Sequence, residues 1–67
     1  MKIKRLRDLR EDNDLTQQNI ADLLKISQRT YSHYENGTRS IPLEFLMELA
    51  NYYNTSIDYI VGNSNIK

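Results

Sequence analysis

The arrangement of short apolar stripes constrains this chain more than any other feature of its sequence. Each stripe has helical spacing, and residues that begin or end helices close it off within a few turns. Ile20, Leu23 and Leu24 are a clear case, since they share one face of a helix that Thr16 is suited to cap. No stretch shows the sustained alternation of a half-buried strand. The sequence therefore predicts an all-α fold.

Five helices account for these stripes. Pro42 fits the first turn of the fourth helix, and Gly37 and Gly62 suit the ends of the third and fifth. The first four expected helices cover about residues 2–12, residues 17–24, residues 28–36, and a stretch with Pro42 in its first turn and an inward stripe that reaches Tyr53. The last covers residues 57–61. Because 67 residues support a single core, we expect one compact five-helix bundle over residues 1–62 and a polar tail at residues 63–67.

Composition narrows the chemistry that the chain can perform. It contains no cysteine and one histidine, which excludes disulfides and thiolate metal sites and argues against a zinc site. The apolar runs are only a few residues long, so neither a signal peptide nor a membrane-spanning helix is expected. We expect a cytoplasmic protein with no metal, cofactor or small-molecule ligand.

The formal net charge is zero, yet the charges are unevenly distributed. Five of the first ten residues are basic and one is acidic, so the rest of the chain carries the compensating negative charge. Lys25, Arg29 and Arg39 lie around the third predicted helix, whereas Glu44 and Glu48 belong to the fourth. This distribution predicts one basic and one acidic side.

The third predicted helix, residues 28–36, has two chemically different faces. Tyr31, Tyr34 and Glu35 fall on one side, where aromatic rings suit a core. The opposite side carries only hydrogen-bonding groups, namely Gln28, Arg29, Ser32, His33 and Asn36. Amide and guanidinium groups can bind adenine and guanine bidentately in the major groove of DNA, which admits an α-helix.

We therefore predict that Gln28, Arg29, Ser32 and His33 contact bases. Gln28 and Arg29 lie at the N-terminal end of their helix, which a recognition helix presents to base edges. An ordinary polar surface remains an alternative, and it fits Ser32 and His33 more readily than the other two. At the start of the second helix, Thr16 is placed to contact a phosphate, because a helix N-terminus offers free N–H groups and a positive dipole end.

Arg10 and Glu35 both fall on inward faces, where an isolated charge is costly. Arg10 is four residues after Leu6 on the first helix, and Glu35 is four residues after Tyr31 on the third. We expect the two to form a largely buried structural ion pair between these helices.

Residues 15–39, LTQQNIADLLKISQRTYSHYENGTR, resemble the Cro and phage-repressor type of helix-turn-helix, the XRE family of transcriptional regulators. The likeness extends to LRDLR before this segment and to IPLEFLMELANYYNTSIDYIVG after it. It implies a lambda-repressor-like bundle with the helix-turn-helix motif at about residues 17–36. The resemblance also implies a sequence-specific regulator of double-stranded DNA, and we expect a repressor that binds a near-palindromic operator as a homodimer.

The same resemblance assigns roles to individual residues. It implies base contacts for Gln28, Arg29 and His33 and an Arg10–Glu35 pair. Residues in the positions of backbone contacts are Gln17, Thr30, Asn36, Thr38 and Arg39, and the apolar candidates for a dimer interface are Ile57, Val61 and Ile66. Ile57 fits the monomer core equally well.

The chain departs from the family pattern at three positions. Lys25 and Asp14 stand where glycine is frequent, and Tyr31 stands where a smaller aliphatic residue is common. A left-handed backbone at Lys25 would cost about 1 kcal/mol or more. None of the three changes removes a predicted DNA contact.

Two other classes of function compete with DNA binding. An enzyme would need a nucleophile, base or metal, and the exposed Glu44 and Glu48 pair is more typical of a solvated helix face. A protein-interaction module, such as an antitoxin or an antirepressor-like adaptor, is the stronger alternative because the net charge is near zero. The groove-suited chemistry of residues 28–36 favours DNA, so we predict a regulator and no enzymatic activity.

Overall fold

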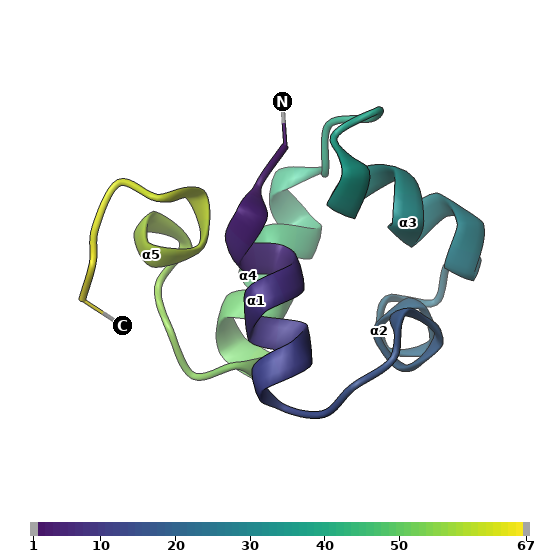
Figure 1. The fold of residues 1–67 in the computed structure, drawn as a ribbon, viewed down its shortest axis with the longest axis horizontal. Helices are drawn as coiled ribbons and strands as arrows, with labels where there is room; N and C mark the ends of the chain where they lie inside the picture. The colour runs from purple at the N-terminus through teal and green to yellow at the C-terminus, as the bar shows by residue number, and fades with distance from the viewer. Residues whose placement is uncertain (1, 67) are drawn as a thin grey trace.

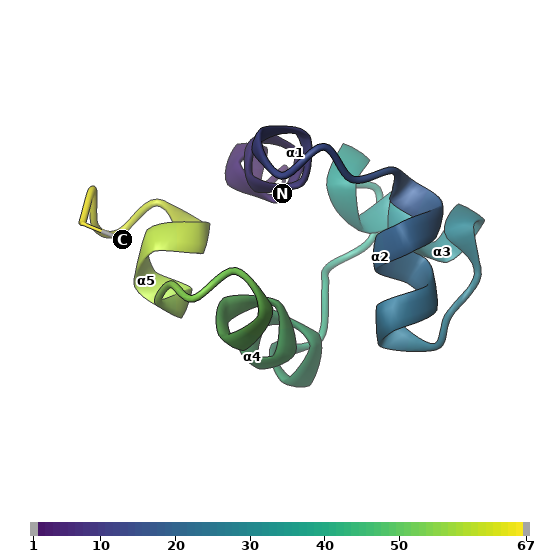
Figure 2. The ribbon, with the colours of Figure 1, turned by 90° about the horizontal axis from the view of Figure 1, so that it is seen from below.

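The computed structural model describes residues 2–66, which form five α-helices (Figure 1). The helices are α1 (Lys4–Asp12), α2 (Gln17–Leu24), α3 (Gln28–Asn36), α4 (Leu43–Tyr52) and α5 (Ile57–Val61). Figure 2 shows α1 and α4 in two layers, with α2 and α3 at one end of the long axis and α5 at the other. The prediction of an all-α, five-helix fold is confirmed.

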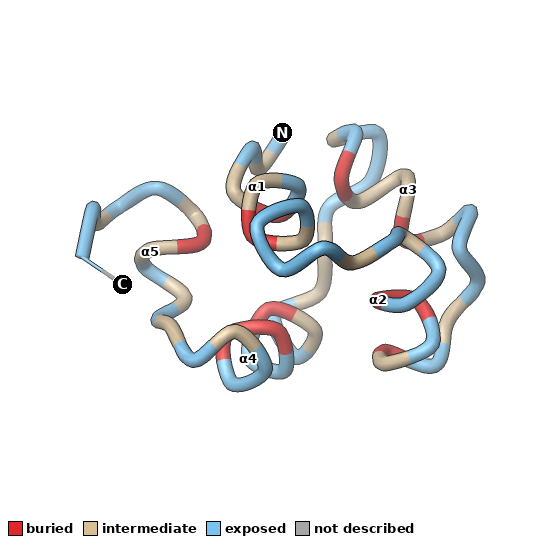
Figure 3. The backbone as a smooth tube through the Cα atoms, turned by 60° about the horizontal axis from the view of Figure 1, so that its bottom comes forward, coloured by how far each residue is buried: buried red, intermediate tan, exposed pale blue. Residues whose placement is uncertain are grey.

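The core draws side chains from all five helices. Tyr31, Leu6 and Leu49 are fully buried at its centre. The remaining buried apolar residues are Leu9, Ile20, Ala21, Leu24, Leu46, Ala50 and Ile60. In Figure 3 the buried stretches of α1 and α4 lie along the sides that face each other. Because every helix is short, this shared core rather than helix propensity stabilises them.

A residue in the left-handed conformation follows the end of each of these five helices. The bonds at the end of α2 are typical: the N–H of Ile26 donates to the carbonyl of Ala21 and that of Lys25 to Asp22, at 3.0 and 3.2 Å. This is a Schellman motif, which satisfies carbonyls that a helix end leaves unpaired. The left-handed residues are Asp14, Lys25, Gly37, Asn54 and Gly62.

Two predicted helix starts were wrong. The first helix begins at Lys4 rather than at residue 2, because Ile3 is extended and the backbone of Lys2 packs against Gly37. The fourth helix begins at Leu43, since Pro42 has φ −60° but an extended ψ of 146° and therefore precedes the first helical residue.

Arg5 ties α5 and the residues that follow it to α1. Its Nη1 donates to the carbonyls of Tyr59 and Ser64 at 2.7 and 2.6 Å, and its Nη2 donates to Oδ1 of Asn65 at 2.8 Å. The guanidinium carbon also lies 4.1 Å from the centroid of the Tyr59 ring. Ser64 and Asn65 of the predicted polar tail are therefore held against α1, whereas Ile66 is exposed. Met1 and Lys67, at the outer ends of the predicted domain and tail, lie outside the described residues.

Candidate nucleic-acid interface

Two short helices joined by a tight turn form the centre of the candidate interface. α2 and α3 pack against each other, and the turn consists of Lys25, Ile26 and Ser27. Lys25 adopts φ 59° and ψ 42°, the left-handed conformation that reverses the chain. Ser27 caps α3 by accepting a hydrogen bond from the N–H of Thr30 at 3.1 Å. The caps therefore fix where α3 begins relative to α2.

An ion pair between α1 and α3 lies beneath this motif. Nε of Arg10 lies 2.8 Å from Oε2 of Glu35, and Nη2 lies 3.1 Å from Oε1, so the contact is bidentate. The side chains are 12% and 3% exposed, and Nη1 of Arg10 also donates to the carbonyl of Leu15 at 2.8 Å. Two charges in a partly buried site are thus satisfied by each other and by the backbone.

The environment keeps Glu35 ionised. Burial by itself raises the pKa of Glu35, but hydrogen bonds from Arg10 and Gln17 outweigh it and hold the pKa below the ordinary value. The hydrogen bond to Glu35 raises the pKa of Arg10 against the opposing effect of burial. Burial raises the pKa of the neighbouring Tyr31, and the nearby carboxylate adds to that shift. Glu35 is therefore an acceptor only, whereas Tyr31 stays neutral.

A chain of hydrogen bonds leads from this carboxylate to the protein surface. Nε2 of Gln17 donates to Oε1 of Glu35 at 3.2 Å, and Nε2 of Gln28 donates to Oε1 of Gln17 at 2.8 Å. An ionised carboxylate accepts and never donates, so it sets the direction of the Gln17 amide and, through it, of the Gln28 amide. The second N–H of the Gln28 amide and its carbonyl oxygen take no part in this chain of bonds.

The four predicted base-contact residues differ in their surroundings. Gln28 and Arg29 are exposed at the N-terminal end of α3, whereas Ser32 and His33 are half-buried. Nδ1 of His33 lies 2.7 Å from the hydroxyl of Thr38, which ties this imidazole to the loop after α3. The polar face of α3 is therefore open at both ends, where Gln28, Arg29 and Asn36 are exposed, and partly covered in between.

The predicted backbone contacts surround that face on both sides. Thr16 forms a capping box with Asn19, in which its hydroxyl oxygen accepts from the Asn19 N–H at 3.1 Å while the hydroxyl hydrogen is not used by the cap. The hydroxyls of Thr30 and Ser27 lie 2.8 Å apart, so Thr30 is partly committed to the cap of α3. Asn36, Thr38 and Arg39 are exposed at the other end of α3.

The apolar residues suggested for a dimer interface separate into two kinds. Ile57 and Val61 are half-buried and pack against the core, whereas Ile66 is 80% exposed. Sequence reasoning missed Leu43 and Met47, which lie one turn apart on α4 and are 63% and 54% exposed. Their i, i+4 spacing was visible, but only the packed structure reveals which face of α4 is left open.

Residues 2–66 contain no group of three or more histidine, aspartate or glutamate side chains placed to hold a metal ion. Within the same range, no helix combines the length and hydropathy needed to cross a membrane.

Comparison with known proteins identifies the fold that carries this surface. A family model described as helix-turn-helix matches residues 6–60. The HTH-type transcriptional regulator AnsR of Bacillus subtilis is 39% identical over 67 residues, which is 100% of this chain and 58% of AnsR. The cryptic phage CTXphi transcriptional repressor RstR of Vibrio cholerae is 38% identical over 60 residues, which is 90% of this chain and 54% of RstR.

A solved structure agrees with these sequence matches. The crystal structure of a transcriptional regulator from Listeria innocua has a TM-score of 0.85 at 35% identity, covering 90% of this chain and 56% of that one. The chain thus spans little more than half the length of these relatives. With most of its residues matched by the family model and by both relatives, the chain belongs to the XRE-type helix-turn-helix family of transcriptional regulators.

Proposed function

We propose that this chain is a sequence-specific DNA-binding regulator, a repressor that inserts α3 into the major groove of an operator. Repression follows from occupying a promoter, and the proposal includes no catalytic step. Because the partner is operator DNA, the protein acts in the cytoplasm. Family membership supports this assignment, and the relatives AnsR and RstR are described as a transcriptional regulator and a transcriptional repressor.

The observation that carries the proposal is the oriented amide of Gln28. Its bond to Gln17 uses one N–H and leaves one donor and one acceptor at an exposed position on α3. Adenine presents the complementary pair in the major groove, since N7 accepts and N6–H donates. Arg29, the next residue, carries a guanidinium suited to O6 and N7 of guanine. We assign lesser base contacts to Ser32 and His33.

The surrounding residues are proposed to bind phosphates. Thr16 and Gln17 lie at the N-terminus of α2, where unpaired N–H groups favour an anion. At the other end of α3, we assign the exposed polar groups of Asn36, Thr38 and Arg39 to phosphates of the DNA backbone. Thr30, in the first turn of α3, is assigned a further phosphate contact. Such contacts position the protein, and base contacts supply sequence preference.

We further propose that two copies bind two half-sites of a near-palindromic operator, about 34 Å apart. Ile66 is the most exposed of the apolar residues assigned to the interface, and Ile57 and Val61 are only partly covered by the core. Sedimentation equilibrium with and without a palindromic duplex measures this stoichiometry. A single copy bound per palindrome would contradict the dimer proposal.

Selection of bound duplexes from a random pool tests the proposed function directly. We expect an enriched motif whose affinity declines steeply with salt, because phosphate contacts release counterions. Failure to enrich any motif, or tight binding that is indifferent to salt, would favour the protein-interaction module instead.

A pair of glutamine variants tests the role of Gln28. Gln28→Ala is expected to lose about 1–3 kcal/mol of discrimination, confined to one base position. Gln18→Ala is the matched control, because Gln18 is an exposed glutamine that bonds to Asp22 on its own helix at 2.8 Å. A loss spread evenly over all sequences would reassign Gln28 to the DNA backbone.

A further inference from the structure

The residues before α1 run extended along the end of α3. Ile3 has φ −100° and ψ 95°. A Cβ atom on Gly37 would lie 2.8 Å from both Cα and N of Lys2, so the two backbones are in close contact. Gly37 has φ 80° and begins the loop that carries Thr38 and Arg39. Lys2 is therefore packed beside a loop for which we propose contacts with the DNA backbone.

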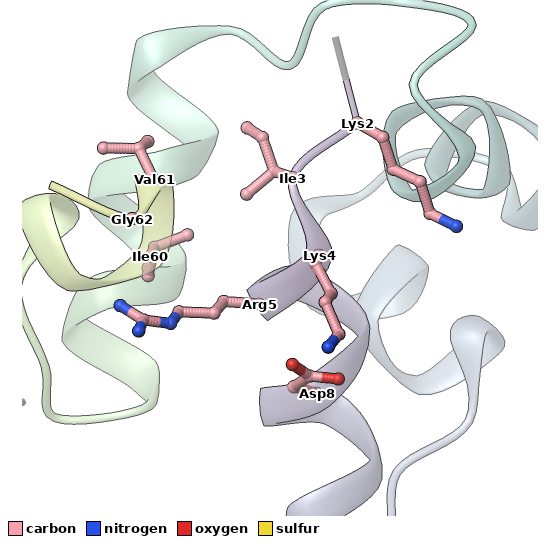
Figure 4. A pocket seen from close by; sticks show the side chains of 8 residues that line it. All are labelled: Lys2, Ile3, Lys4, Arg5, Asp8, Ile60, Val61 and Gly62. Atoms are coloured by element: carbon pink, nitrogen blue, oxygen red, sulfur yellow. The ribbon is translucent and has the colours of Figure 1, made fainter. Parts of the chain in front are cut away.

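Lys2 and Lys4 have different surroundings although they are two residues apart. Both are exposed, and neither forms an ion pair among residues 2–66. Figure 4 shows them at the edge of a pocket of about 450 Å³ formed largely by α1 and α5. In this view the side chain of Lys4 points toward that of Asp8, four residues further along α1, whereas the side chain of Lys2 points away from it. Only Lys2 has its backbone against Gly37, so of the two lysines it is the one beside the loop that follows α3.

We infer that Lys2 binds a phosphate of the operator backbone, adjacent to the phosphates contacted by Thr38 and Arg39; the inference rests on the proposed function. Its ammonium group is a compact charge on a flexible stem, so it needs no fixed geometry to reach a phosphate. The contact adds affinity without sequence preference, because phosphates are the same at every position. It extends the protein's footprint beyond the helix-turn-helix to the N-terminal segment.

The test compares the full chain with Lys2→Gln and Lys4→Gln. The second variant is the matched control, because it removes the same charge only two residues further along the chain, at the first residue of α1. Binding to the selected duplex is measured by fluorescence anisotropy between about 50 and 200 mM KCl. Lys2→Gln is expected to reduce the salt slope of log K by about 0.9, so its affinity deficit shrinks about 3.5-fold over this range. Lys4→Gln is expected to keep the wild-type slope.

A second measurement locates the contact on the DNA. Single phosphates of the duplex are replaced by neutral methylphosphonates, and one replacement should weaken binding by the wild type but not by Lys2→Gln. Suppose that the affinity of the wild type depends on salt. If Lys2→Gln then has the wild-type salt slope, or if Lys4→Gln lowers the slope as much as Lys2→Gln does, the inference fails and the proposed function stands. If the wild type binds no duplex, both fail.

Discussion

Removing one charge of the Arg10–Glu35 pair is expected to destabilise the protein more than removing both. The perturbation is a double-mutant cycle consisting of Arg10→Met, Glu35→Gln and the combined variant. Arg10→Met leaves the carboxylate of Glu35, which is 3% exposed, without its cationic partner. Glu35→Gln leaves the guanidinium of Arg10, which is 12% exposed, without its anionic partner. The double variant leaves a neutral amide beside an apolar side chain, so no unpaired charge stays buried.

The structure sets the size of each effect. Arg10→Met should cost about 3–5 kcal/mol of unfolding free energy, as for other buried pairs that lose one partner. Glu35→Gln should cost about 1.5–3 kcal/mol, the usual value of hydrogen bonds to a charged group, because Arg10 keeps its bond to the Leu15 carbonyl. A chain of this length has a total stability of roughly 3–10 kcal/mol, so Arg10→Met is expected to be marginally folded.

Urea unfolding followed by circular dichroism measures the cycle, with an osmolyte added to all variants to keep the weakest one folded. Because the double variant should lose less than either single variant, we expect a coupling energy of at least about 3 kcal/mol. Arg7 and Glu11 provide the control, because this pair on α1 is 3.3 Å apart but 59% and 52% exposed, and its coupling should stay below about 1 kcal/mol. Costs in the buried cycle that add within about 0.5 kcal/mol would refute the reasoning.

The same pair predicts how stability depends on pH. The folded protein holds the pKa of Glu35 below its ordinary value of 4.5, so below that pH the unfolded chain binds more protons than the folded one. The contribution of the pair is therefore present above pH 4.5 and is lost as the pH falls toward the folded-state pKa. Glu35→Gln should lose less stability than the wild type on acidification in this range. Parallel acid profiles of the two proteins would argue against an ionised Glu35.

Two further predictions concern left-handed residues. Lys25→Gly should relieve about 1–2 kcal/mol of backbone strain in the folded state and lose about 0.4–1 kcal/mol because the unfolded chain becomes more flexible. The net effect should raise Tm by a few degrees. An unchanged or lower Tm would contradict this prediction. Gly37→Ala should be more destabilising than Gly62→Ala in urea by at least about 1 kcal/mol, because only the first new Cβ meets the backbone of Lys2. Equal losses would mean that the N-terminal segment moves aside without cost.

Local residue patterns were sufficient to predict most of the helices. Thr16, Ser27 and Ser56 cap their helices as their hydroxyl chemistry requires, and each accepts a bond from the N–H three residues on. Helical spacing also identified the inward faces, including the positions of Arg10 and Glu35. These features depend on neighbours within one or two turns, so they can be read without knowing the fold.

The starts of α1 and α4 could not be read in this way. The first helix is shortened by a contact between Lys2 and Gly37, which are 35 positions apart by their numbering. Pro42 has the φ of a helical residue, and only the path of the loop into α4 sets its extended ψ. Both boundaries therefore depend on tertiary packing and not on local preference.

The candidate site divides in the same way. Sequence alone determined which side chains lie on the polar face of α3, because helical periodicity and residue chemistry are local properties. Only the tertiary structure decided that Gln17 joins Glu35 to Gln28 and that Lys2 lies against the end of α3. Hydrogen bonds and backbone contacts between segments far apart in the chain depend on atomic distances that the packed core sets, and no pattern within one helix encodes them.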